Sequence, residues 1–115
     1  AVVGMSDKPE RTSYRIGHYL KDQGYQVYPV NPRIEQSGDL KAYASLADVP
    51  VPIDIVNVFR RSEDVPPVVE EAIETQAKSV WMQLGIQHQE AAKKAEAAGL
   101  SVIMDRCILV EHRKL

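Results

Sequence analysis

The stretch VVGMSDKPERTSYRIG, residues 2–17, joins a short apolar run to a helical pattern through one glycine and a basic loop. The apolar run predicts a buried strand, and Gly4 allows the sharp turn by which the chain leaves it. Apolar residues then recur at helical spacing over residues 12–23. A strand, a loop and a helix in this order are typical of the first half of a βαβ unit.

Similar apolar runs recur along the rest of the chain, at steps of 21 to 28 residues. The five runs are AVVG (1–4), QVYPV (26–30), IDIVNVF (53–59), SVWMQL (79–84) and SVIMD (101–105). Helical patterns between them cover residues 12–23, 65–76 and 88–98. The connection from 31 to 52 predicts only a helical turn at 45–50, and residues 106–115 predict a short helix or a tail. Strands that alternate with helices indicate parallel pairing.

The predicted fold is therefore α/β, a Rossmann-like three-layer sandwich with a five-stranded parallel sheet. With 115 residues, the chain predicts one domain, residues 1–115. Right-handed crossovers leave two common strand orders, 3-2-1-4-5 and 2-1-3-4-5, of which we expect the first. Both orders place a ligand crevice at the carboxyl ends of the strands, so the residues that follow each strand are the candidate site.

Composition limits the classes of partner. The chain is 44% hydrophobic and 26% charged with a net charge of −2, which disfavours general nucleic-acid binding. No apolar run approaches the ~20 residues that span a bilayer, so we expect no membrane partner. Cys107 is the single cysteine, which suits a cytoplasmic protein. The first strand starts at residue 1 with no signal peptide before it, and we expect either a trimmed chain or a leader upstream.

The loop after the first strand carries the chemistry of an anion site. Ser6, Thr12 and Ser13 offer hydroxyls, and Lys8 and Arg11 offer positive charge. The helix that follows directs free N–H groups and a partial positive charge toward the loop. The loop therefore predicts a phosphate or pyrophosphate site, with a solvated connecting loop as the alternative from these residues alone.

This loop departs from the dinucleotide fingerprint G-x-G-x-x-G. Ser6 stands where the second glycine would be, and the next glycine is Gly17. An NAD site also uses an acidic residue after the second strand, where this chain reads VNPR, residues 30–33. The sequence therefore disfavours NAD, while NADP stays open through Arg33 and a 2′-phosphate.

Later strand ends add further candidate contacts. Phe59 could pack on an adenine or a pantetheine arm, with Arg60 and Arg61 adding charge, and the alternative is a core phenylalanine beside solvated arginines. Gly85 after the fourth run permits a close backbone approach. Cys107 follows the fifth run, and we expect it to be a partly buried, inert thiol.

Candidates for catalysis are few. The three histidines, at positions 18, 88 and 112, lack metal-ligand spacing, and no histidine neighbours Cys107 in the sequence. We predict no catalytic residues and no metal site. Enzymatic activity stays an open question, with a binding module as the favoured answer.

Together, VVGMSDKPERTSYRI, YPVNPR, DIVNVFRRSEDVP, WMQLGI and AGLSVIMDRC resemble the small stand-alone CoA-binding proteins. Their domain is similar to the N-terminal part of the succinyl-CoA synthetase α subunit and of related acyl-CoA synthetases. The resemblance implies that the loop 4–13 holds the phosphates of CoA, that residues 30–33 line the adenosine end, and that the remaining residues border the crevice. The implied contacts are Gly4, Met5, Ser6, Lys8, Arg11, Thr12, Ser13, Val30, Asn31, Pro32, Arg33, Phe59, Arg60, Leu84 and Gly85.

The synthetases also use a phosphohistidine outside this domain, and no histidine here matches its context. We therefore expect a non-catalytic protein that binds coenzyme A or acyl-CoA, a nucleotide-type ligand, in the cytoplasm. An NAD(P)-binding oxidoreductase or redox sensor that uses the same crevice is one alternative. A ligand-regulated accessory protein, whose protein partner the sequence does not name, is the other.

Overall fold

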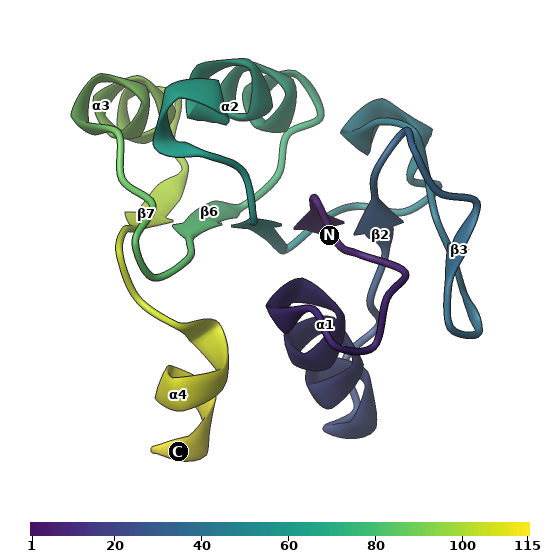
Figure 1. The fold of residues 1–115 in the computed structure, drawn as a ribbon. Helices are drawn as coiled ribbons and strands as arrows, with labels where there is room; N and C mark the ends of the chain where they lie inside the picture. Colours follow the sequence, from purple (N-terminus) through teal and green to yellow (C-terminus); the bar gives the residue numbers. More distant parts are fainter.

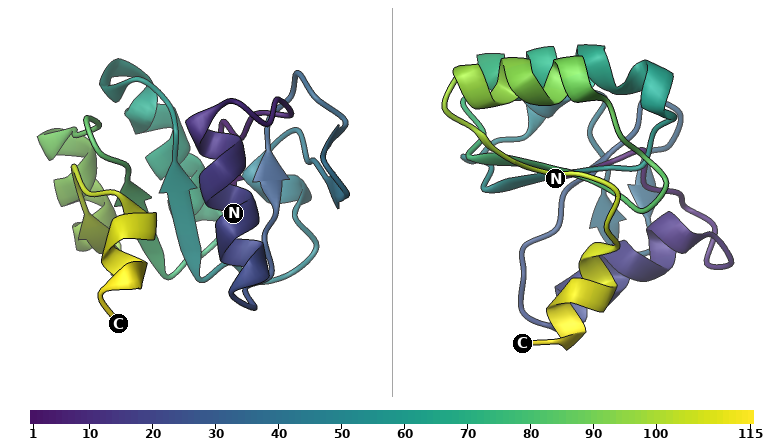
Figure 2. Two further views of the ribbon diagram at one scale, coloured as in Figure 1. Left: turned by 60° about the horizontal axis from the view of Figure 1, so that its bottom comes forward. Right: turned by 90° about the vertical axis from the view of Figure 1, so that its left-hand side faces the viewer.

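Five parallel strands form the central layer of the computed structural model, which describes residues 1–115. The strands are β1 (Val2–Val3), β2 (Pro29–Val30), β5 (Ile55–Val58), β6 (Ser79–Met82) and β7 (Ser101–Ile103). Helices α2 (Val65–Glu74) and α3 (Gln89–Ala97) cover one face of the sheet, and α1 (Thr12–Asp22) and α4 (Ile108–Arg113) cover the other (Figures 1 and 2). The predicted Rossmann-like three-layer architecture with a five-stranded parallel sheet is confirmed.

The expected strand order was wrong. The sheet runs β2-β1-β5-β6-β7, which is 2-1-3-4-5 when its strands are counted along the chain, not 3-2-1-4-5. The outer edge of β2 is occupied by Tyr43, which accepts a hydrogen bond from Asn31 N–H and donates one to the carbonyl of Pro29, both at 2.8 Å. Because this edge is taken, the third strand of the sheet pairs with the other side of β1.

Side chains along β5 alternate between the two helical layers. Val56 and Val58 are fully buried in the larger core, which lies between the sheet and the α2/α3 layer. Ile55 packs against the smaller core, built from Val2, Met5, Ile16, Leu20, Val27 and Ile108 on the α1/α4 face. Strands covered on both faces read as nearly continuous apolar runs, which is why the sequence revealed them.

The helices end within two residues of the predicted ranges 12–23, 65–76 and 88–98. Pro66 and Pro67 occupy the first turn of α2, where a missing N–H leaves no hydrogen bond unmade. Residues 106–115 form the short helix α4, and the predicted turn at 45–50 is a 3₁₀ helix, Leu46–Asp48. A second 3₁₀ turn, Ser62–Asp64, precedes α2. None of the helices has the length and apolar composition to cross a lipid bilayer.

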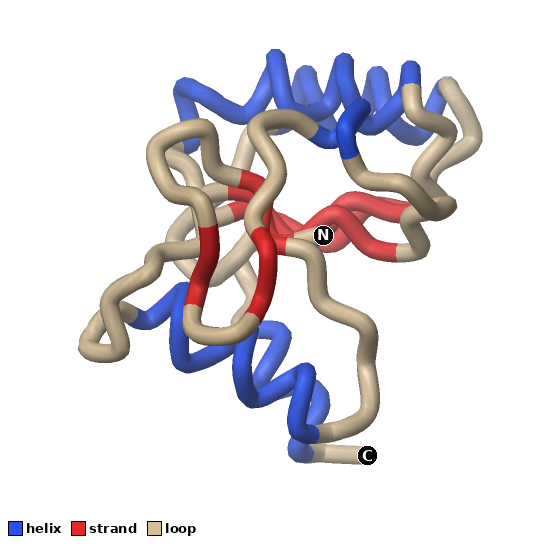
Figure 3. Tube along the Cα trace, turned by 90° about the vertical axis from the view of Figure 1, so that its right-hand side faces the viewer, coloured by secondary structure: helices blue, strands red, loops and turns tan.

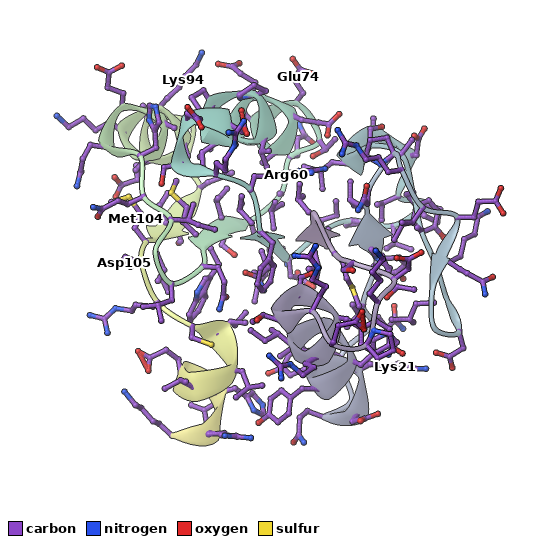
Figure 4. The ribbon with its side chains drawn as sticks, viewed as in Figure 1. Lys21, Arg60, Glu74, Lys94, Met104 and Asp105 are labelled. Atoms are coloured by element: carbon purple, nitrogen blue, oxygen red, sulfur yellow. The ribbon has the colours of Figure 1, made fainter.

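A small hairpin that the sequence did not predict stands beside the main sheet (Figure 3). Its strands are β3 (Gln36–Ser37) and β4 (Leu40–Lys41), joined antiparallel by a two-residue turn. Gly38 takes φ +59 in this turn, the conformation that two-residue hairpins require. Lys21 extends from α1 toward the hairpin (Figure 4), and its Nζ lies 2.5 Å from Oδ2 of Asp39. The hairpin is therefore fastened to α1 as well as to β2.

Gly4 marks a point where two backbones nearly touch. It leaves β1 with φ +88, and a Cβ at this position would lie 2.3 Å from the carbonyl oxygen of Phe59 at the end of β5. Gly24 has a similar φ of +98, but a Cβ there would meet nothing within 4 Å. The two glycines therefore separate the effect of backbone conformation from that of collision.

We expect Gly4→Ala to cost clearly more stability than Gly24→Ala. Left-handed φ alone costs an alanine about 1–2 kcal/mol, and only at Gly4 does a backbone collision add to this. Urea unfolding of the two variants and the wild-type chain measures the difference. Equal losses of unfolding free energy in the two variants would contradict the close approach of β1 and β5.

The Lys21–Asp39 pair gives a second prediction. A hydrogen bond from Lys21, aided by a backbone hydrogen bond within Asp39 and by the lysine charge, holds the pKa of the Asp39 carboxyl below its usual range. A depressed carboxyl pKa means that the contribution of the pair to stability is present at neutral pH. That contribution is lost as the pH falls through the folded-state pKa.

Lys21→Ala should therefore raise the pKa of Asp39 toward its ordinary value, as followed by NMR titration of the side-chain carboxyl carbon. Lys78→Ala is the matched control, because Lys78 pairs with Asp54 at a distant part of the sheet. A pKa of Asp39 that is unchanged in Lys21→Ala would show that the hairpin is not held by this ion pair.

Candidate functional site

The carboxyl ends of the parallel strands bring the predicted site residues to one edge of the sheet. The winding of the sheet reverses between β1 and β5, since β2 lies on one side of β1 and β5, β6 and β7 on the other. The loops that follow β1 and β5 diverge from this point, which is where open α/β sheets bind ligands. We call the region between these two loops, next to the close approach of Gly4 and Phe59, the crevice.

The loop after β1 is braced by its own side chains. The N–H of Ser6 donates to Ser13 Oγ at 2.9 Å, and the N–H of Lys8 donates to Ser6 Oγ at 3.0 Å. Met5 is fully buried and packs against Gly17 of α1, so its side chain faces the core rather than the crevice. The loop thus has a fixed shape, in which Ser13 is a brace from α1.

Several backbone donors of this loop are available to a ligand. The N–H groups of Asp7, Thr12, Ser13 and Tyr14 donate to no other group of the chain. The last three belong to the first turn of α1, where the helix dipole adds a partial positive charge. Backbone donors at such a position suit phosphate oxygens.

Four cations around the crevice lack acidic partners. Lys8, Arg11 and Arg33 are exposed and Arg60 is half-buried, and none of them forms a salt bridge. Arg61, directly after Arg60, instead pairs with two carboxylates of the Ser62–Asp64 turn. The side chain of Arg60 passes over Gly4, with its Cδ 3.5 Å from where a Cβ would stand, and Figure 4 shows it between the two helical layers. An incoming anion would therefore have no ion pair to break at these four positions.

The residues after β2 have a more structural role than the sequence suggested. Asn31 Nδ2 donates to the carbonyl of Met5 at 3.1 Å, and Asn31 Oδ1 accepts from the N–H of Arg33 at 3.0 Å. Val30 is buried in the core and accepts a hydrogen bond from Gly4 through its backbone. Only Pro32 and Arg33 are exposed in this segment. Asn31 is therefore a tie between two loops, with both ends of its amide engaged inside the protein.

The segments after β6 and β7 close the far side of the edge. Leu84 is 67% exposed, and Gly85 takes φ +85 while its N–H donates to Asp105 Oδ1 at 2.7 Å. Asp105 lies toward β7, away from Arg60 (Figure 4). Gln83, beside Leu84, is buried, and its Oε1 accepts from the N–H of Ile108. Leu84 is thus an apolar surface on this rim, and Asp105 holds the turn that carries it.

A well-defined cavity lies elsewhere in the chain. It measures about 580 Å³ and opens on the α1/α4 face toward the amino ends of the strands, among Tyr25, Val27, Ile55, Trp81 and His112. None of the predicted site residues lines it, and it contains no lysine or arginine. Asn57 lines it from β5, with both polar atoms of its amide buried and without a partner. Such a lining suits neutral or apolar groups, so the crevice and not this cavity is the candidate phosphate site.

Sequence reasoning missed two residues that shape the crevice. Ser37 of the hairpin is fully buried, and its Oγ donates to the carbonyl of Ser6 at 2.7 Å. His18 lies 3.3 Å from the same Oγ atom through its Nε2. The hairpin was absent from the predicted elements, although a Gly-Asp pair at 38–39 is a recognised turn signal.

Relatives of the chain include both small proteins and parts of larger ones. The uncharacterized protein YneT of Bacillus subtilis is 49% identical over 112 residues, which cover 97% of this chain and 83% of YneT. A hypothetical protein from Pyrococcus horikoshii matches in structure with a TM-score of 0.96 and 42% identity, over 99% of this chain and 80% of that one.

The α subunit of an ADP-forming acetate–CoA ligase II from Pyrococcus furiosus is 35% identical over 81 residues. These residues make up 70% of this chain and only 18% of the ligase subunit. The chain therefore matches one part of a much longer enzyme. Residues 1–113 match the sequence pattern of the CoA binding domain, and the protein belongs to this CoA-binding domain family.

Proposed function

We propose that the protein binds coenzyme A or acyl-CoA in the crevice between the loops that follow β1 and β5, without catalysing a reaction on it. The observation that carries this proposal is the set of four unpaired cations, Lys8, Arg11, Arg33 and Arg60, around one crevice in a member of the CoA-binding family. Coenzyme A carries a pyrophosphate and a 3′-phosphate, and both kinds of group need such partners.

The pyrophosphate is assigned to the loop after β1 and the first turn of α1. The free N–H groups of Thr12, Ser13 and Tyr14 are the donors there, and Lys8 and Arg11 supply charge at short range. Arginine binds phosphate oxygens through two parallel hydrogen bonds, and such charge-assisted bonds are stronger than neutral ones. Ser6 and Ser13 each accept a backbone hydrogen bond within the loop and so hold it in place, while their hydroxyl protons remain free to donate.

The two ends of the ligand are assigned to opposite sides of this loop. The 3′-phosphate and adenosine lie toward β2, where Arg33 and Pro32 are exposed and where Asn31 keeps the loops together. The pantetheine arm lies toward β6, where Phe59, Leu84 and Gly85 offer apolar and backbone surface. Arg60, whose side chain passes over Gly4, lies between the β2 side assigned to adenosine and the β6 side assigned to pantetheine.

The chain spans less than a fifth of the ligase subunit that it resembles. The ligation chemistry of that enzyme is therefore not carried over to this protein. The dinucleotide fingerprint has a second glycine where this chain has Ser6, and it has an acidic residue after the second strand where this chain reads VNPR (30–33). Both departures argue against a dinucleotide in the same crevice.

Calorimetry with purified protein tests the proposal, and we expect CoA to bind far more tightly than NAD or NADP. Arg11→Ala should weaken CoA binding by about 1.5–3 kcal/mol, the range for losing a hydrogen bond to a charged group. Arg113→Ala is the control, because it removes the same charge at the end of α4, where Arg113 lies over the ring of Tyr19. Absence of heat with CoA and with short acyl-CoAs would overturn the proposal, as would equal effects of the two arginine variants.

A further inference from the structure

The hairpin β3–β4 reaches the loop after β1 through a single buried hydroxyl. Ser37 has no exposed surface, and its Oγ donates to the carbonyl of Ser6 at 2.7 Å. With its proton committed there, the same Oγ accepts from Nε2 of His18 at 3.3 Å. This connection joins the hairpin to the loop after β1 and to α1, which lie 31 and 19 residues earlier in the sequence.

Two buried serines hold the peptide groups on either side of Ser6. Ser13 Oγ accepts a hydrogen bond from the N–H of Ser6 at 2.9 Å, and Ser37 Oγ donates one to the carbonyl of Ser6 at 2.7 Å. Asn31 Nδ2 donates to the preceding carbonyl, that of Met5. Carbonyl oxygens repel phosphate oxygens, so the bonds from Ser37 and Asn31 turn the two repelling carbonyls of the loop, those of Ser6 and Met5, into the protein.

The orientation of one carbonyl also fixes the next N–H. In a trans peptide the C=O and the N–H point in opposite directions, and the chain has no cis peptide bonds. The Ser6 carbonyl is directed at Ser37, so the N–H of Asp7 is directed away from it. This N–H donates to no other group of the chain.

We propose that Ser37 is a positioning residue of the phosphate loop, which aims the N–H of Asp7 at a phosphate of the ligand. This role rests on the proposed CoA binding and adds a residue from outside the strand ends to that site. Ser37 does not contact the ligand itself; it acts through the peptide between Ser6 and Asp7.

The surroundings of His18 support a fixed geometry for Ser37. The His18 ring stacks on Tyr14, with ring centroids 4.0 Å apart. Gly38 leaves room for this ring, since a Cβ at Gly38 would lie 2.8 Å from Cε1 of His18. Because the Ser37 proton is donated to the Ser6 carbonyl, His18 is the donor in its contact with Ser37 Oγ.

The test compares Ser37→Ala with Ser101→Ala, a serine in β7 that is exposed and makes no side-chain hydrogen bond. Calorimetry with CoA and with dephospho-CoA, which lacks the 3′-phosphate, is run at a temperature where thermal unfolding shows each variant to be folded. We expect Ser37→Ala to weaken both ligands about fivefold or more, since it leaves a buried carbonyl unpaired and a donor misdirected. The ratio of the two affinities should stay at its wild-type value, because the 3′-phosphate lies at the other end of the ligand.

A changed ratio would show that the substitution also disturbs the 3′-phosphate end of the site, and would argue against a specific role of Ser37; a general loss of folded protein would lower both apparent affinities by the same factor, which is why each variant is measured where it is folded. NMR gives a readout without ligand: the amide signal of Asp7 should shift in Ser37→Ala and stay in place in Ser101→Ala. His18→Ala, which keeps the hydroxyl but removes its support, should weaken CoA in the same direction and by a smaller factor.

The experiment tests CoA binding and the positioning role of Ser37 separately. A wild-type chain that binds CoA together with a Ser37→Ala variant of unchanged affinity would overturn the positioning role alone. A wild-type chain that binds neither CoA nor dephospho-CoA would overturn the proposed function and this role with it.

Discussion

The close approach of Gly4 to the carbonyl of Phe59 is the constraint on which the rest of the structure depends. A Cβ at Gly4 would stand 2.3 Å from that oxygen, so only glycine lets β1 and β5 end side by side with their loops turning apart. The candidate site lies where these two loops turn apart. α1 follows the first loop, so its free N–H groups are brought to the crevice by the same turn.

The strands and helices that arise from local sequence patterns could be predicted from the sequence. Strands covered on both faces produce apolar runs, and helices between them produce a 3.6-residue pattern, so the parallel sheet was recognisable. The strand order was not, because it depends on Tyr43 occupying the edge of β2, a contact without a sequence signature of its own. The hairpin carried only a Gly-Asp turn signal at 38–39, and its strands are two residues long.

The candidate site shows the same division. Its cations were predictable, because Lys8, Arg11, Arg33 and Arg60 follow strands, and parallel strands end at one edge. The roles of Ser13 and Asn31 were not, because a hydroxyl or an amide serves a ligand or the protein according to what lies within 3 Å of it. In the structure both are engaged by loop backbone. Sequence identifies polar groups near a site, while tertiary contacts decide which of them are still free.

The charge distribution reconciles an overall acidic chain with an anion site. Net charge is −2, yet most cations away from the crevice pair with carboxylates, as Lys21 does with Asp39 and Lys94 with Glu70. The crevice cations form no such pairs, although Asp7 and Glu10 lie in the same loop. Attraction between exposed charges is screened beyond about 10 Å, so an anion beside the crevice would interact with these local groups more than with the net charge. In the proposed binding mode, a ligand with phosphates at two separated points contacts the loop after β1 with one of them and Arg33 with the other.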